Sequence, residues 1–281
     1  MKFTVNDLQK QDTDFLSLLG DMKRVAIGDR PAFTTRHKGI KAFIQAKNAT
    51  TPRTMVADSQ ITLDTISVSA RPVIDRIAIQ TGRVNMSDLA AEASQAMTHQ
   101  KIKYIWNVLE NAVTTWAHPF YGEGSGIVST TFDPMVLHWL RSGGCTILGD
   151  IEAVGKLAGM TGFVTVQPTT TNGAMQFSND IINEFNRSGM VGAYRGASVV
   201  KMVNPYEDDG VTPLLDTGKL FLLPTGAAAE TRPLKIVEEG DVFSMEATNI
   251  DDLKYELRLD QYFGAGIVTG TTPAMGCYQI N

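Results

Sequence analysis

The sequence lacks the features that mark several large classes of protein. It has only two cysteines, Cys145 and Cys277, and they form neither a C-x-x-C pair nor a metal-ligand spacing. This argues against a disulfide scaffold and predicts two small buried residues in a reduced, cytosolic protein. No apolar run approaches the ~20 residues that a membrane helix needs. Residues 1–15 contain no apolar core of a signal peptide, so we expect a soluble chain that is not exported.

Clustered positive charge is also lacking. The formal net charge is −5, the isoelectric point is near 5.4, and lysine and arginine form no run. Proteins that grip nucleic acid carry basic patches that neutralise its phosphates. The composition therefore argues against nucleic acid as a direct ligand.

Catalytic and metal-binding motifs are missing as well. The sequence has no H-E-x-x-H motif and no G-x-S-x-G elbow, and its four histidines are scattered. Cys145 follows His138 closely, but nucleophile and base are rarely neighbours in sequence, so we do not assign them as a catalytic pair. Residues 207–210 lack alternating oxygen ligands for a hard cation and predict a solvated turn. We assign no catalytic, cofactor-binding or metal-binding residue.

Three glycines, Gly122, Gly124 and Gly126, lie in the segment 121–130. A phosphate-binding loop needs a strand before it and a helix after it. Here a long predicted helix precedes the segment and the residues IVSTTF follow, so we reject a phosphate cradle. The prediction is a flexible hinge.

The stretch 84–116 has sustained helical periodicity and contains neither glycine nor proline. We expect one long helix, capped by Asn85 or Ser87 and closed by His118-Pro119. Its apolar residues recur at three-to-four spacing and predict one buried stripe. The stripe comprises Leu89, Ala93, Ala96, Met97, Ile102, Ile105, Leu109, Ala112, Val113 and Trp116. The polar residues between these positions are Lys101, Lys103, Asn107 and Glu110.

The residues before this helix predict little core. A weak helix over 5–19 ends at Gly20, a polar tail follows to residue 30, and 31–60 is an extended excursion with one strand at 40–44. Alternation over 66–70 predicts a half-buried strand. Pro72 confines it to a sheet edge or a bend, after which the apolar positions Ile77 and Ile79 continue the strand.

The residues after the helix predict a mixed α/β unit over 133–205 and a β-rich last third. Helices are expected at 133–142, 151–159 and 178–189, and strands at 146–150, 163–177, 199–203 and 219–226. Residues 232–248 predict two strands. The segment 253–260 alternates strictly, with Leu257 and Leu259 on the core face and Arg258 and Asp260 in water. Residues 263–281 form a final strand and tail.

This order of elements, with its sequence texture, resembles the major capsid protein of tailed bacteriophages, which has the Hong Kong 97 fold. The resemblance covers nearly the whole chain, and none of its motifs is catalytic. Its most specific parts are ITLDTISVSARPVIDRIAIQTGRVNMSDLA (61–90), GAYRGASVVKMVNPY (192–206), KLFLLPTG (219–226) and YELRLDQYFGAGIV (255–268).

The resemblance implies an α+β, Hong Kong 97-like fold with five parts. They are an N-terminal arm at 1–32, an extended loop at 33–70, a spine helix at 86–116, a peripheral domain at 71–130 and 225–262 that contains this helix, and an axial domain at 131–224 and 263–281. Such a subunit forms the hexamers and pentamers of an icosahedral virion shell, assembled in the host cytoplasm. Its implied partners are a separate scaffolding protein, a portal, in some phages a decoration protein, and packaged double-stranded DNA bound without sequence specificity.

Two further expectations follow from the resemblance. The family prototype carries its scaffold as a removable amino-terminal extension, whereas the family-like region here begins within about 30 residues of Met1, so we expect no loss of an amino-terminal domain. Some relatives join a loop lysine to an asparagine of a neighbour. The candidates here are Lys38, Lys41 and Lys47 with Asn249 or Asn281, and we predict no cross-link. An encapsulin-like compartment and a cytosolic α/β enzyme are the alternatives, and no membrane association is expected.

Overall fold

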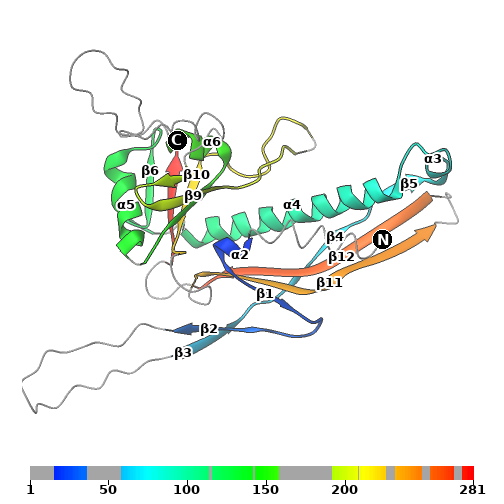
Figure 1. Ribbon diagram of the computed structural model, residues 1–281, viewed down its shortest axis with the longest axis horizontal. Coiled ribbons are helices and arrows are strands. Elements are labelled where there is room, and N and C mark those ends of the chain that lie inside the picture. Colours follow the sequence, from blue (N-terminus) through cyan, green and yellow to red (C-terminus); the bar gives the residue numbers. More distant parts are fainter. Residues whose placement is uncertain are drawn as a thin grey trace, which may run out of the picture.

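The computed structural model shows an elongated subunit organised around one long helix (Figure 1). This helix, α4 (Met86–Val113), runs along one sheet and ends beside a second. Within the part of the chain that is described, no helix is long and apolar enough to cross a membrane. The described residues are 16–36, 58–113, 116–141, 143–157, 192–207, 209–225, 232–248, 254–268 and 274–281.

Helix α4 confirms the spine helix predicted at 86–116. The observed helix ends earlier, at Val113. Asn85 caps it, because its Oδ1 accepts a hydrogen bond from the Ser87 amide at 3.2 Å. Its 28 residues span about 42 Å at 1.5 Å per residue. Two predictions along this helix are wrong: Ala96 of the stripe is exposed, and Lys101, expected between the apolar positions, is completely buried. Trp116 lies beyond the helix.

A five-stranded sheet lies against α4. Its order is β1-β11-β12-β4, with β5 also paired to β12. The predicted alternation is confirmed, because Leu257 and Leu259 face the core while Arg258 is exposed. The prediction of two strands over 232–248 is wrong. One strand crosses an irregularity between Glu239 and Phe243, and Gly240 adopts φ +72° there. The bounds are β1 Asp21–Val25, β4 Ile66–Ala70, β5 Val73–Asp75, β11 Leu234–Thr248 and β12 Lys254–Ile267.

Pro72 lies where the sequence placed it, at a bend on the edge of this sheet. Strands β4 and β5 flank it, and both pair with β12 in antiparallel fashion. The continued strand through Ile77 and Ile79 is wrong, because these residues form a short helix, α3 (Arg76–Gln80). The Ile77 side chain is 72% exposed.

The six-stranded sheet forms the second half of the molecule, with α5 (Ser129–Arg141) and α6 (Ile151–Lys156) packed on it. Helix α5 begins earlier than predicted, so Pro134 lies inside it. The strands and helix expected at 163–177 and 178–189 fall outside the described residues. The sheet order is β6 (Tyr121–Gly124), β13 (Gly276–Ile280), β10 (Lys219–Leu223), β7 (Thr146–Gly149), β9 (Ala197–Lys201) and β8 (Ala193–Tyr194).

The predicted hinge at 121–130 is wrong. Residues 121–124 form β6, which pairs in parallel with β13, and helix α5 follows at Ser129. A strand therefore precedes the glycine-rich loop and a helix follows it, contrary to the expectation on which a phosphate loop was rejected. The side chain of Tyr278 occupies this loop instead. The Tyr278 hydroxyl accepts a hydrogen bond from the Val128 amide and donates one to the Gly126 carbonyl, both at 3.0 Å. A Cβ at Gly124 would collide with that hydroxyl, which explains the glycine.

The amino-terminal residues are more ordered than predicted. Of the helix expected at 5–19, the described part is α2 (Leu16–Leu19), whose Leu16 and Leu19 are buried in the main core. The expected polar tail instead forms β1, parallel to β11. Strands β2 (Ala32–Arg36) and β3 (Asp58–Thr62) pair as a ribbon, and the strand expected at 40–44 lies outside the described residues.

The two large sheets divide the chain at different points from the expected domains. Strand β6, expected in the peripheral domain, belongs to the six-stranded sheet. The end of β12, residues 263–267, was expected in the axial domain but belongs to the five-stranded sheet. Strand β4, expected in the extended loop, also pairs within that sheet.

Candidate assembly interface

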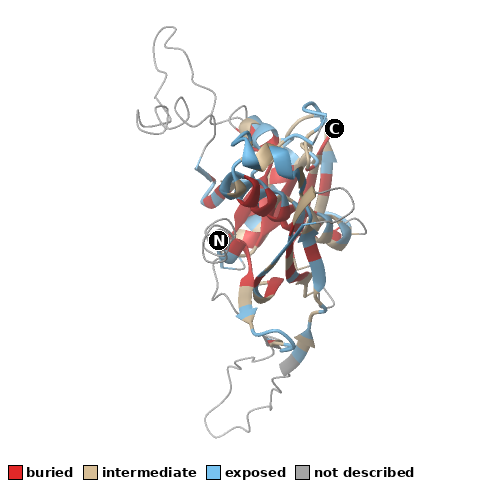
Figure 2. Cartoon of the chain, turned by 90° about the vertical axis from the view of Figure 1, so that its right-hand side faces the viewer, coloured by how far each residue is buried: buried red, intermediate tan, exposed pale blue. Residues whose placement is uncertain are grey.

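The ribbon of β2 and β3 projects from the body of the subunit (Figures 1 and 2). It is anchored at its base. Phe33 is completely buried, with the Lys23 ammonium 4.6 Å and the Lys235 ammonium 5.5 Å from its ring centroid. Lys23 also donates a hydrogen bond to the Ala32 carbonyl at 2.8 Å. The base of the ribbon is thus fixed to the sheet while the strands lead away from it.

Among the described residues, side chains on the face of the five-stranded sheet turned away from α4 are buried at the end near the ribbon. Near the ribbon, Lys235 and Val237 are buried on this face, and a Cβ at Gly266 would meet Leu63. Farther along β11 and β12 the same face carries apolar side chains in water. Phe243 is 51% exposed, Met245 54% and Tyr262 43%. Exposed apolar groups gathered on one sheet face are typical of a surface that is covered on association.

A buried charge cluster braces this sheet against α4. Lys101 is completely buried, and its ammonium lies 3.1 Å from a Glu238 carboxylate oxygen and 2.6 Å from the Gln261 side-chain oxygen. Arg24 of β1 binds the other oxygen of Glu238 at 2.9 Å. Because Glu238 accepts from both cations, α4, β11 and β1 are linked through one carboxylate.

A second ion pair holds β1 to its neighbour. The Lys235 ammonium lies 3.0 Å from the Asp21 carboxylate, and both residues are buried. Strand β1 is therefore part of the folded sheet, although the sequence around it looks like a polar tail.

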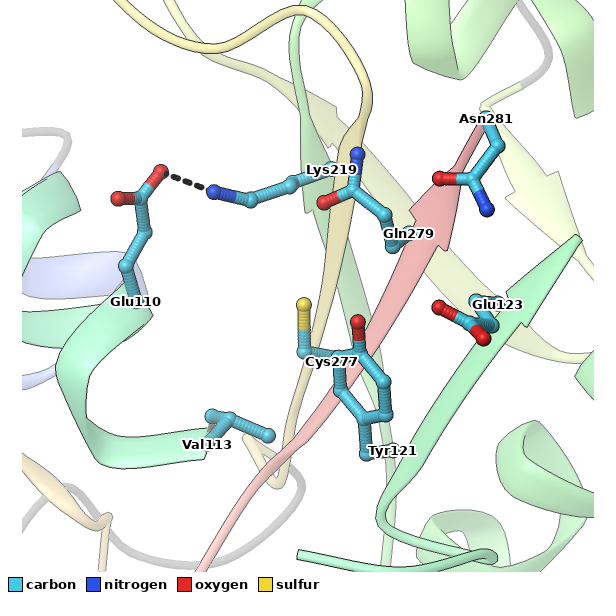
Figure 3. A pocket seen from close by; sticks show the side chains of 8 residues that line it. All are labelled: Glu110, Val113, Tyr121, Glu123, Lys219, Cys277, Gln279 and Asn281. Carbon is cyan, nitrogen blue, oxygen red and sulfur yellow. Dashed lines mark hydrogen bonds and ion pairs between the residues drawn. The ribbon is translucent and has the colours of Figure 1, made fainter. Parts of the chain in front are cut away.

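A cavity of about 330 Å³ lies at the joint between the end of α4 and the six-stranded sheet (Figure 3). Lys219 spans the joint, with its ammonium 2.9 Å from Glu110 and 2.9 Å from Asp216. Burial lowers the pKa of Lys219, but the hydrogen bonds and charges of both carboxylates outweigh it and raise the pKa. Cys277 lines the cavity, and burial raises the pKa of its thiol to about 12. A thiol protonated at neutral pH is a poor nucleophile.

His138 and Cys145, the residues considered as a base and a nucleophile, lie in packed surroundings. His138 packs edge-on against Phe120 and Trp139, and burial raises the pKa of Cys145 to about 12. Both cysteines are buried and free, as predicted.

The turn predicted at 207–210 is also confirmed. The Asp209 carboxylate accepts hydrogen bonds from the Val211 and Thr212 amides and from the Thr212 hydroxyl. Glu207 pairs with Lys103 at 2.9 Å. Among the described residues, no group of three His, Cys, Asp or Glu side chains is placed to hold a metal ion.

Sequence reasoning missed the features that shape this surface. The burial of Lys101 depends on Glu238 and Gln261, which lie far away in the chain. The one local signal was a lysine at i+4 from Met97 and i−4 from Ile105, inside the buried stripe. The ribbon strands carried no clear alternation.

Known proteins match this chain over nearly its whole length. A family model described as "SPbeta prophage-derived putative capsid protein YonB" matches residues 3–279. No curated protein matches the sequence.

Solved structures with a similar fold are numerous. The head of Helicobacter pylori bacteriophage KHP40 has a TM-score of 0.59 at 11% identity, over 95% of this chain and 90% of that one. The capsid of cyanophage P-SCSP1u gives 0.58 at 11%, over 95% and 86%. A virus-like particle from Pyrococcus furiosus gives 0.51 at 12%, over 99% and 97%. At these identities the likeness shows a shared fold.

Proposed function

The chain belongs to the YonB family of prophage-derived capsid proteins, and we propose that it is the major capsid protein of a tailed double-stranded DNA bacteriophage. The observation that carries this function is the match of one family model to residues 3–279, on a fold shared with phage head proteins over nearly the whole chain. The α+β capsid fold inferred from the order of elements is confirmed.

The alternatives receive less support. The family is one of capsid proteins, so an encapsulin-like compartment is not favoured. A structural role is indicated rather than an enzymatic one, and the burial of both thiols fits this role. We propose that the chain has no catalytic activity.

The projecting ribbon supports an assembly role for the segment 33–70. A two-stranded ribbon is marginally stable alone in water, so it gains most from a neighbouring surface. We propose that the part of this segment before β4 is an extended loop that clamps adjacent subunits, and that 1–32 is an arm docked through α2 and β1. The spine helix with the five-stranded sheet forms the peripheral domain, and the six-stranded sheet forms the axial domain.

The proposed assembly is an icosahedral shell of hexamers and pentamers, formed in the host cytoplasm. A separate scaffolding protein, a portal and, where present, a decoration protein are the proposed partners. The shell encloses double-stranded DNA without sequence-specific contacts. The net charge of −5 suits this role, because a strongly cationic lining would hold DNA by counterion release.

Negative-stain microscopy of the recombinant chain, alone and coexpressed with a scaffolding protein from the same prophage, tests this function. We expect closed shells or capsomers of uniform diameter. A protein that stays monomeric in both samples would contradict the proposal.

A further inference from the structure

Strand β4 is an open edge of the five-stranded sheet. It pairs with β12 on one side, and no described strand pairs with its other side. Its sequence, Ile-Ser-Val-Ser-Ala over 66–70, contains no charge and no proline, and its register with β12 is regular. Natural proteins usually protect exposed edges with charges, prolines or bulges because a bare edge pairs with other chains. Strand β4 itself carries none of these devices.

Four other edge strands of the two large sheets are protected. Strand β1, at the opposite edge of the same sheet, carries Asp21, Lys23 and Arg24 in ion pairs and hydrogen bonds. In the six-stranded sheet, β6 bears two glycines and Glu123, and β8 has two residues. Even β5, which continues the edge of β4, follows Pro72 and ends in Asp75. Among these five edge strands, β4 alone has more than two residues and carries neither a charge nor a proline.

The hydrogen-bonding groups of this edge point outward at two serines. The Leu257 amide donates to the Pro72 carbonyl at 3.1 Å, so the odd-numbered residues of β12 direct their backbone groups toward β4. Their partners in the register are Ile66, Val68 and Ala70. The alternate residues, Ser67 and Ser69, therefore direct their N–H and C=O groups away from the sheet, and both are exposed.

The ribbon supplies the complementary strand. Its β2 edge is engaged near the base, where the Lys23 ammonium binds the Ala32 carbonyl. Strand β3 pairs with β2 alone among the described strands. Its residues, Asp-Ser-Gln-Ile-Thr over 58–62, are mostly short and polar, as are Ser67 and Ser69, and Ser–Thr pairs across strands are favourable.

We propose that β3 of one subunit pairs with the open edge of β4 in a second copy, which extends the five-stranded sheet across the subunit boundary. This inference rests on the proposed capsid function, and it identifies the contact by which the ribbon would hold a neighbouring subunit. Strand addition satisfies the outward groups of Ser67 and Ser69 and turns a marginal two-stranded ribbon into part of a wider sheet. Since the donor and acceptor surfaces differ, the contact is head-to-tail, and such a contact generates a ring where its rotation closes.

Disulfide trapping between two differently labelled variants tests this pairing. One variant carries Ser67→Cys, and the other carries a single cysteine at one of the four positions 59–62. Opposed residues of antiparallel strands have Cα atoms about 4.5–5.5 Å apart, within the range that a disulfide bridges. Cys145 and Cys277 are each 4% exposed and compete little. The two variants are mixed, assembled and oxidised with copper phenanthroline in air. Asn107→Cys, at an exposed position of α4, replaces Ser67→Cys in the control.

We expect cross-linked dimers in the mixture for at least one of the four positions, and none with the Asn107→Cys control. Cross-linking of the Ser67→Cys variant with itself would overturn the proposal, because β4 would then face β4. Shells that form normally without any mixed cross-link would also overturn it, while leaving the capsid function intact. Failure of the unmodified chain to assemble, in contrast, would count against the capsid function itself.

A proline substitution gives an independent measurement. Ser67→Pro removes an outward N–H that β12 does not use, whereas Ser67→Thr keeps it. We expect Ser67→Pro to leave the circular dichroism of the unassembled subunit unchanged and to abolish shells, while Ser67→Thr assembles normally. Normal assembly of a folded Ser67→Pro subunit would contradict strand addition at this edge.

Discussion

The ammonium of Lys101 lies 3.1 Å from the Glu238 carboxylate, and the lysine side chain is completely inaccessible to water. Removing one partner of a buried ion pair leaves the other charge buried with less compensation. We expect Lys101→Met to lower the free energy of unfolding by about 3–5 kcal/mol. Denaturant unfolding of the unassembled subunit measures this loss.

The same helix provides a matched control for that measurement. Lys103, two positions later, pairs with Glu207 at 2.9 Å, but both side chains are substantially exposed. Exposed pairs contribute at most about 1 kcal/mol, so Lys103→Met should have a small effect. Equal losses for the two variants would mean that Lys101 is not buried as described.

The Tyr278 hydroxyl holds the loop between β6 and α5 through the Val128 amide and the Gly126 carbonyl. Tyr278→Phe keeps the ring and leaves both backbone groups without this partner. We expect destabilisation of about 1–3 kcal/mol and faster hydrogen exchange at the Val128 amide. Tyr206→Phe, at a residue that is 64% exposed, is the control. Unchanged exchange at Val128 would contradict the role of the hydroxyl.

Burial raises the pKa of the Cys145 and Cys277 thiols from 9.0 to about 12. The folded state therefore retains these protons at a pH where the unfolded chain releases them. Stability from this source is complete below pH 9 and is lost as the pH rises toward 12. We expect negligible reaction with a thiol reagent at pH 8 in the native subunit and two reactive thiols after unfolding. Rapid native labelling would contradict the burial.

The spine helix and the extended loop should fail in different ways. Ile105→Asp or Leu109→Asp places an unpaired charge in the core, where both residues are completely buried, so neither subunit should fold. Replacing 41–50 by a Gly-Ser linker should preserve folding and abolish assembly. Circular dichroism and sedimentation separate the two outcomes. Normal shells from the linker variant would mean that the extended loop has been misplaced.

Local periodicity was enough to predict the elements whose burial is set by their own residues. The stripe through Ile105 and Leu109 and the alternation through Leu257 and Leu259 were both confirmed. The glycine-rich strand β6 was missed because it exists by pairing with β13 at the far end of the chain. Residues 232–248 were predicted as two strands, whereas β11 continues through the irregularity between Glu239 and Phe243.

The candidate interface was harder to predict than the fold. Lys101 looked solvated because its partners, Glu238 and Gln261, are more than a hundred positions away. Phe243 and Met245 are exposed because the ribbon lies near the other half of their face of the five-stranded sheet. Alternation of apolar and polar residues along a strand does not show which half of a face is covered. Pro72 indicated that β4 lies at a sheet edge. The lack of charged residues in β4 points to a pairing surface only when the strand order shows that this edge is open.

The most direct test of the capsid function is the protein composition of DNA-filled particles released after induction of a prophage that encodes this chain. Particles are purified by density, treated with nuclease, and analysed by denaturing gel and mass spectrometry. We predict that this 30.6 kDa chain is the most abundant protein, that it runs as a single band, and that the protected nucleic acid is double-stranded DNA. Absence of the chain from such particles, or its recovery in particles filled with protein instead of DNA, would contradict the account.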